Sequence, residues 1–160
     1  MRKVDQLFSE YGESHQTRFN KIIHYICVPA IVFSIVGLLA SIPVGGLFQG
    51  ILPDTMLGYA NLGTILIIFS MLFYLRLSLP LAVGLLFFSA FVLWGNYQIA
   101  ASGAPLWLVS AVIFIVAWVF QFIGHNHEGK KPSFLKDVQF LMVGPAWIMG
   151  FIYRKWGIKY

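Results

Sequence analysis

The stretch IIHYICVPAIVFSIVGLLASI, residues 22–42, decides the fold of this 160-residue chain. It is long and apolar, and a helix needs about 20 such residues to cross the hydrocarbon core of a bilayer. Three further runs of this kind follow it, at about residues 56–75, 79–100 and 105–124. We therefore predict an all-α fold, a polytopic membrane helical bundle with four transmembrane helices in a single integral membrane domain over residues 1–160.

The composition leaves almost no room for a soluble domain, because 59% of the residues are hydrophobic and only 11% are charged. Soluble domains carry about 25% charged residues. The first twenty residues are polar and lack the apolar core of a signal peptide. Cys27 is the single cysteine, so it forms no internal disulfide, and we expect it to pack as a small residue.

Short polar connections predict how the spans pair. The sequence Arg76-Leu77-Ser78, before Pro80, predicts a hairpin of the spans 56–75 and 79–100, and Ala101-Ser102-Gly103 predicts another between the spans 79–100 and 105–124. A fifth apolar stretch, 138–153, reaches only about 24 Å as a helix. Gly144-Pro145 interrupts it, and proline disrupts a helix interior. We interpret it as a re-entrant or interfacial helix, with a short fifth span as the alternative.

The basic residues predict the orientation of the chain. With four spans, all eleven lysines and arginines fall on one face, and the opposite loops, 43–55 and 101–104, contain none. The positive-inside rule then places both termini in the cytoplasm. A crossing fifth stretch would leave three of the eleven outside, which favours the re-entrant interpretation. The net charge of +5 does not indicate nucleic acid, since these cations are dispersed beside apolar spans, where topology and lipid headgroups account for them.

All four histidines flank the apolar spans, and this orientation places His15, His24, His125 and His127 on the cytoplasmic side. Imidazole is the commonest protein ligand for transition metals. Their spacing in the sequence matches no compact metal motif. The prediction of a shared site therefore depends on the membrane orientation, which places all four histidines on the same side. His15 and His24 would lie on opposite sides of one straight helix. They converge only if the chain bends between them, and we expect that bend at residues 16–18.

The neighbours of these histidines leave alternatives open. Asn20 would share a helical face with His24. It is a helix cap, a partner that orients the His24 ring, or a solvated side chain. If the last span continues as a helix beyond Gly124, His125 and Glu128 lie on the same helical face and His127 points away from it. If the chain is extended after Gly124, His125 and His127 lie on the same face instead. Gly129 and Pro132 predict that any such helix ends soon.

Two segments resemble the signatures of the Mpo1-like family, formerly a domain of unknown function. The first is Tyr11–Pro29, with His15, Asn20 and His24; the second comprises Gln121–His125, Glu128–Pro132 and Gly144-Pro145. The resemblance covers nearly the whole chain. It implies an Fe(II)-dependent dioxygenase of fatty-acid α-oxidation that shortens a 2-hydroxy fatty acid by one carbon. The eukaryotic member works in the endoplasmic reticulum membrane on 2-hydroxy fatty acids from phytosphingosine breakdown.

The resemblance also implies site residues. His15, His24 and His125 match family histidines and are the expected catalytic iron ligands. Glu128 matches a family acid and is a further candidate ligand, whereas His127 has no clear counterpart and is either another ligand or peculiar to this chain. Histidine and carboxylate ligands with open positions suit non-haem Fe(II) oxygenation.

A 2-hydroxy acid suits such a site, because its carboxylate and hydroxyl can chelate a metal. The reaction R-CH(OH)-COOH + O₂ → R-COOH + CO₂ + H₂O balances without a further reductant. The acyl tail would lie among the spans. The carboxylate would lie at the interface, where Arg18, Lys130 or Lys131 could attract it; ordinary positive-inside anchoring is the alternative role of these cations.

Two other functions compete with the dioxygenase. One is a non-catalytic membrane protein that binds lipid or assists assembly, and the other is a zinc-dependent membrane hydrolase that uses the same ligands. Metal analysis separates them, since iron favours oxygenation, zinc favours hydrolysis and an empty site favours the binding protein. The absence of a retrieval signal leads us to expect a bacterial inner membrane, with the active site facing the cytoplasm. The sequence does not indicate an oligomeric state.

The charge pattern makes a topological prediction. Both termini should be cytoplasmic, because only then do all eleven basic residues share one side. Tags at the two ends, tested for protease access in oriented vesicles, measure this directly. Termini on opposite faces would exclude the re-entrant interpretation of residues 138–153.

Overall fold

The computed structural model describes residues 2–42, 44–131 and 139–160, and every regular element in these ranges is helical. The elements, in chain order, are α1 (Lys3–Gly12), α2 (Arg18–Ala40), the short 3₁₀ helices η1 (Gly45–Phe48) and η2 (Asp54–Tyr59), α3 (Leu62–Leu77), α4 (Leu79–Ala101), α5 (Leu106–Glu128) and α6 (Phe140–Lys155). The predicted all-α membrane bundle is confirmed. Pro132, Lys136 and Val138, which entered the sequence predictions, lie outside the described residues.

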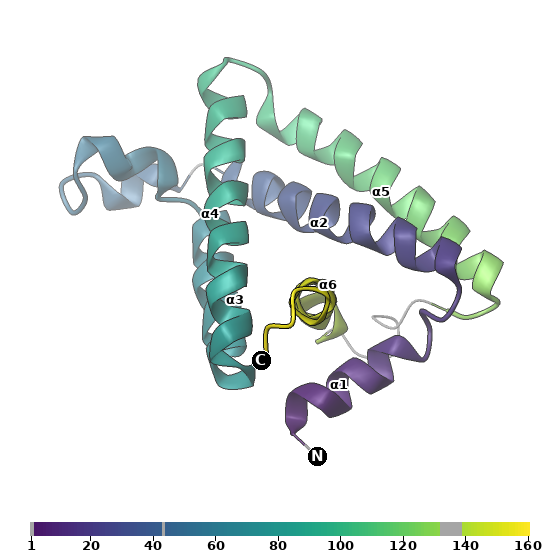
Figure 1. Ribbon diagram of the computed structural model, residues 1–160. Coiled ribbons are helices and arrows are strands. Elements are labelled where there is room, and N and C mark those ends of the chain that lie inside the picture. The colour runs from purple at the N-terminus through teal and green to yellow at the C-terminus, as the bar shows by residue number, and fades with distance from the viewer. Residues whose placement is uncertain (1, 43, 132–138) are drawn as a thin grey trace.

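Two helix pairs form the frame of the molecule. α2 and α5 run antiparallel along their whole length, while α3 and α4 form a hairpin that crosses them (Figure 1). The α2–α5 contact is close because α5 presents small buried residues, Ser110, Ala117 and Gly124, to its partner. Small residues let helix backbones approach each other in a membrane, where apolar burial drives association less than it does in water.

Three helices, α2, α4 and α5, are long and apolar enough to cross a membrane. The predicted span 79–100 matches α4 within one residue, whereas α5 continues four residues beyond the predicted end at Gly124. The predicted span 56–75 began too early. Residues 54–59 form η2 instead, and the Asn61 side chain caps α3 by accepting a hydrogen bond from the Thr64 amide at 3.0 Å. α3 is therefore a shorter apolar helix of 16 residues.

The two predicted hairpins have different outcomes. Ser78 alone lies between α3 and α4 and caps the second helix, so the first hairpin is confirmed. The second connection is as short as expected and turns at Gly103, whose φ is +80°. However, α5 then diverges from α4 and packs along α2 (Figure 1). The sequence indicated the turn but not the packing partner.

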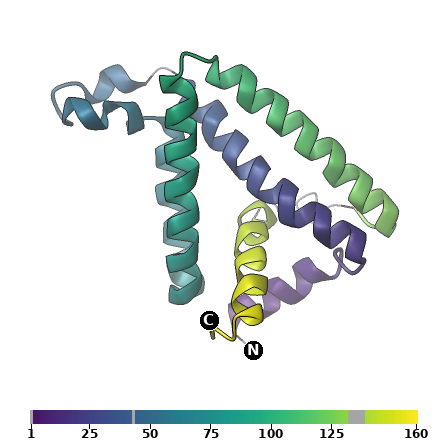
Figure 2. The same ribbon diagram turned by 45° about the horizontal axis from the view of Figure 1, so that its top comes forward.

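α6 continues as a helix through Pro145 and packs against α1, α4 and α2. Near its start, the Tyr74 hydroxyl donates to the Met142 carbonyl at 3.0 Å, and near its end the Tyr153 hydroxyl donates to the Pro80 carbonyl at 2.9 Å. Its C-terminal end therefore lies at the α3–α4 turn, beside both chain termini (Figure 2). This arrangement is compatible with the re-entrant interpretation, because the helix does not extend to the opposite end of the bundle.

α1 was not predicted from the sequence. It buries Val4, Leu7, Phe8 and Tyr11, which recur at helical spacing on one face, against α6. The outward faces of α3, α4 and α5 carry large exposed apolar side chains, including Phe69, Leu72, Phe87, Phe91, Trp107 and Ile115. Exposed apolar area on this scale marks a surface that faces something other than water, here the lipid.

Candidate metal centre

Three helix ends meet where α2 begins and α5 ends. α1 stops at Gly12, a short turn carries His15, and Thr17 caps α2 by accepting a hydrogen bond from the Asn20 amide at 3.3 Å. The chain therefore bends between His15 and His24, as their convergence requires. His125 comes from the last turns of α5, which lies against the first turns of α2.

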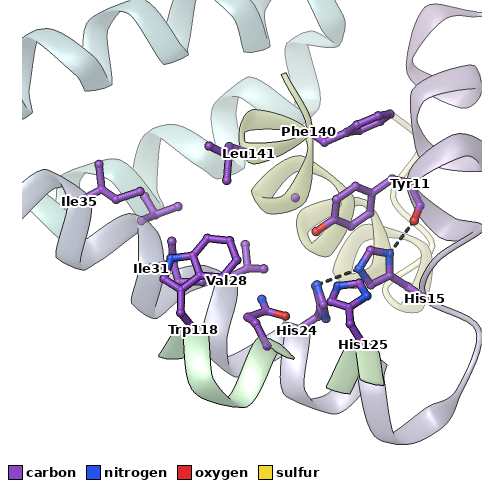
Figure 3. Close-up of a pocket in the computed structure, with 13 residues that line it drawn as sticks. Tyr11, His15, His24, Val28, Ile31, Ile35, Trp118, His125, Phe140 and Leu141 are labelled. Atoms are coloured by element: carbon purple, nitrogen blue, oxygen red, sulfur yellow. Dashed lines mark hydrogen bonds between the residues drawn. The ribbon is translucent and has the colours of Figure 1, made fainter. Parts of the chain in front are cut away.

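His15, His24 and His125 form one buried group. Each offers one ligand atom, and these atoms all lie within 4.8 Å of one another, close enough to hold a metal ion. The His125 ring centroid lies 5.0 Å from those of both His15 and His24. Figure 3 shows the three rings gathered at one end of the cavity beneath Tyr11. The predicted convergence of these histidines is thus observed.

The hydrogen bonds of His15 and His24 determine which ring nitrogens are free. His15 Nδ1 lies 2.5 Å from the Tyr11 carbonyl oxygen, and His24 Nδ1 lies 3.1 Å from the Asn20 carbonyl oxygen. Because a carbonyl can only accept, each Nδ1 carries the proton, and the neutral ring keeps its lone pair on Nε2. Metal-binding histidines are commonly oriented by such a bond from the second ring nitrogen.

The two free nitrogens face each other. His15 Nε2 and His24 Nε2 are 2.7 Å apart, and two lone pairs at that distance repel unless a cation lies between or beside them. Burial lowers the pKa of His15 to about 4, which favours the neutral ring at pH 7 and disfavours relief of the repulsion by protonation. A metal ion beside the two nitrogens would remove this repulsion, and the three histidines are close enough to hold one.

His125 completes the group. Its Nδ1 is buried and has no hydrogen-bond partner within the described part of the chain. A buried nitrogen without a partner is costly in a finished structure, and a ligand that uses its lone pair removes that cost. The donor set is then three imidazoles, which suits zinc, copper, iron or nickel.

Aromatic residues of α1 and α6 cover the group from the side opposite to α5. Tyr11 is buried and stacks on His15, with ring centroids 4.3 Å apart and an interplanar angle of 15°. Trp147 lies next to both of these rings. Burial raises the pKa of the Tyr11 hydroxyl, so this residue stays neutral beside the histidines. The sequence alone gave no sign of this cover, because α1 was not recognised as a helix.

Glu128 lies outside the histidine group and has other partners. One oxygen accepts a hydrogen bond from the Gln16 amide, and Oε2 accepts from the Thr17 hydroxyl at 3.0 Å and from Asn20 Nδ2 at 2.9 Å. The Thr17 amide also donates to Oε2, at 3.3 Å. The carboxylate thus ties the end of α5 to the first turn of α2, where the helix dipole favours a negative charge.

Asn20 is buried and takes part in this connection. Its Nδ2 also donates to the Ser14 carbonyl at 3.0 Å, and its own carbonyl oxygen orients His24. Of the three roles considered for the Asn20 side chain, the structure supports none: the helix cap is Thr17, the side chain is buried, and the bond to His24 comes from the Asn20 backbone. The side chain instead connects Ser14 with Glu128. α5 stays helical to Glu128 and ends at Gly129, whose φ is +71°.

The other candidate residues lie apart from the group. His127 is exposed and its ring contacts Phe19, with centroids 4.9 Å apart, as expected for a helix in which His127 points away from His125. Arg18, Lys130 and Lys131 are exposed. None of these four residues lines the cavity at the histidines.

The histidines line a cavity of about 50 Å³ between α1, α2, α5 and α6 (Figure 3). Gln121, one helical turn before His125, also lines it, and the Gln121 Oε1 is buried without a hydrogen-bond partner among the described residues. Sequence reasoning did not select Gln121. Its spacing of four residues from His125 places both on one face of α5, which was the available signal.

A family model described as 2-hydroxy-palmitic acid dioxygenase Mpo1-like matches residues 1–156 of the chain. No match to the chain was found among curated proteins or among solved structures. The matched region contains all of the residues that form the candidate metal centre.

Gly124 is predicted to control whether His125 reaches the other two histidines. A Cβ at position 124 would lie 2.5 Å from Asn20 Oδ1 and 3.2 Å from Ile23 Cδ1. Gly124→Ala must therefore displace the Asn20 side chain from its hydrogen bonds to Ser14 and Glu128, or push α5 away from α2. We expect metal affinity to fall by about ten- to a hundredfold, as for other losses of support around a metal site. Metal titration of the purified protein measures it.

The matched control is Gly46→Ala, because a Cβ at position 46 has no neighbouring atom within 4 Å. This variant should bind metal like the unaltered protein. Equal affinity in both variants would show that the close α2–α5 approach does not position the site.

Proposed function

The chain belongs to the Mpo1-like family, and from this membership we propose that it is an Fe(II)-dependent dioxygenase of fatty-acid α-oxidation. It would convert a long-chain 2-hydroxy fatty acid and O₂ to the fatty acid one carbon shorter, with release of CO₂. The observation that carries the proposal is the buried group of His15, His24 and His125, in which two imidazole lone pairs face each other.

The residues fit the metal that the family name implies. Three neutral imidazole nitrogens can hold Fe(II) and leave positions open for other ligands. When bound, the iron would supply the electron transfer to O₂ that no side chain can supply. The carbonyls of Tyr11 and Asn20 keep the Nδ1 protons of His15 and His24 turned away from the centre, so both Nε2 atoms stay available.

Further residues would recognise the polar end of the substrate. Gln121 Oε1 is free to accept a hydrogen bond inside the cavity, which suits the hydroxyl group of a 2-hydroxy acid. Arg18, Lys130 and Lys131 are exposed in the chain segments next to the histidines and would attract the carboxylate as it approaches from the interface. The cover formed by Tyr11 and Trp147 limits the access of water to the centre.

The stoichiometry supports the assignment. R-CH(OH)-COOH and O₂ give R-COOH, CO₂ and H₂O, and the substrate supplies all four electrons that reduce O₂. Hence the protein needs no binding site for a second organic reductant. We further propose that it works in a bacterial inner membrane, with both termini and the site on the cytoplasmic side, in keeping with the distribution of its basic residues.

Two alternatives use the same observations differently. A zinc-dependent hydrolase would use the same three histidines, and a lipid-binding or assembly protein would leave them without metal. The repulsion between the Nε2 atoms of His15 and His24 argues against the last of these, because a protein without a cation there would keep an unfavourable contact.

Paired substitutions test the ligand assignment. His125→Ala should abolish iron binding and turnover, because it removes a ligand and with it the centre that binds O₂. His127→Ala should retain both, because its ring is exposed and packs on Phe19. The fold should survive either change.

The measurement is iron content, followed by aerobic incubation of each Fe(II)-loaded protein with 2-hydroxypalmitic acid and mass analysis of the product. The proposal expects the acid one carbon shorter from the unaltered protein and from His127→Ala. Iron loss in His127→Ala together with iron retention in His125→Ala would refute the assignment, and tight zinc with no oxidised product would favour the hydrolase.

A further inference from the structure

A second and larger cavity lies in the bundle beyond the histidines. It measures about 450 Å³ and is lined by residues of α2, α3, α4 and α6 and by Gln139, which precedes α6. Cavities of about 300–1,000 Å³ are typical of small-molecule sites, whereas the cavity at the histidines, of about 50 Å³, has room only for the polar end of a ligand. We refer to the larger cavity, bounded by residues such as Val36, Ile67, Leu85 and Ser89, as the chamber.

The chamber and the histidine cavity share part of their walls. Val32 and Ile35 of α2 and Leu141 of α6 line both. The two cavities are therefore adjacent, and a ligand with its polar end at the histidines would enter the chamber past these three apolar side chains. Figure 3 shows Ile35 and Leu141 on the side of the histidine cavity away from the histidine rings.

The chamber wall offers little to a polar ligand. None of the described residues that line it is charged. The Ser70 hydroxyl donates to the Leu66 carbonyl at 2.9 Å, and the Tyr74 hydroxyl donates to the Met142 carbonyl at 3.0 Å. These hydroxyl hydrogens are already used within the protein. The other polar side chains in the lining are Ser89, whose hydroxyl lies 4.0 Å from Met71 Sδ, and Gln139, and the rest of the lining is apolar. A polar ligand group placed against this apolar part would lose its hydrogen bonds to water.

We propose that the chamber binds the acyl tail of a single-chain 2-hydroxy fatty acid, and that Ile67 and Ser89 at its walls limit the length of tail that the protein accepts. This inference rests on the proposed function for the polar end of the ligand. One free fatty acid then occupies both cavities, with its carboxyl end at the histidines and its methyl end in the chamber.

Neighbouring isoleucines on α3 provide a matched test. Ile67 is 8% exposed and lines the chamber, whereas Ile68 is 56% exposed on the lipid-facing side. Ile67→Trp should lower the turnover of 2-hydroxypalmitic acid relative to 2-hydroxyoctanoic acid by about tenfold or more, because single methylene contacts in apolar pockets already have effects of this size. Ile68→Trp should leave the ratio unchanged. Ser89→Leu narrows the chamber from the α4 side and replaces Ile67→Trp as the test variant if that protein does not fold.

Photolabelling makes the test independent of turnover. Metal-free protein is irradiated with a long-chain fatty acid that carries a diazirine at its methyl end, and the labelled residues are mapped. The proposal expects label on chamber residues such as Ile67 and Ser89, suppressed by excess 2-hydroxypalmitic acid but not by phosphatidylcholine. If the label stays in the chamber while no 2-hydroxy acid is oxidised, the proposed function fails and the acyl site stands.

Three results would overturn the chamber proposal. The first is label confined to lipid-facing positions such as Ile68 and Leu72. The second is equal suppression by phosphatidylcholine, which would indicate a space filled by bilayer lipid. The third is an unchanged ratio of long-chain to short-chain turnover in folded Ile67→Trp and Ser89→Leu.

Discussion

The carboxylate of Glu128 ties the end of α5 to the beginning of α2, and the candidate site depends on this connection. Its hydrogen bonds to Gln16, Thr17 and Asn20 hold the turn that contains His15 against the helix that carries His125. The same turn ends at the cap of α2, one helical turn before Asn20 offers its carbonyl to His24. A residue that looked like a metal ligand in the sequence is better explained as the support that brings the three ligands together.

The rest of the bundle surrounds this polar group with apolar structure. α1 and α6 cover it with Tyr11 and Trp147, and the small residues of α5 allow α2 to lie close enough for the histidines to meet. Burial favours the neutral form of His15, so its lone pair remains available to a cation. α6 contributes to both cavities through Leu141, which lines the histidine cavity and the chamber alike.

The sequence predicted the apolar architecture better than the details of the site. α4 was predicted within one residue because a largely apolar run without a charged residue lies between Ser78 and the turn at Gly103. The start of α3 was missed because hydropathy does not register the cap formed by Asn61. The pairing of α5 with α2 could not be predicted. The short connection between α4 and α5 indicates that these two helices are neighbours, and α5 diverges from α4 because small residues such as Ser110 and Gly124 pack against α2. The three histidines were identified from their residue type and from their predicted position on one side of the membrane. The role of Glu128 could not be predicted in this way, because it depends on contacts between residues more than 100 positions apart.

The central claim is that three imidazoles hold one iron ion at the junction of α1, α2 and α5. X-ray absorption at the iron edge, recorded on protein loaded with Fe(II) under anaerobic conditions, tests it most directly. We expect one iron per chain with three imidazole nitrogens at roughly 2.0–2.2 Å, by analogy with other first-row metal sites. A first shell made only of oxygen atoms, with no imidazole scattering, would contradict it.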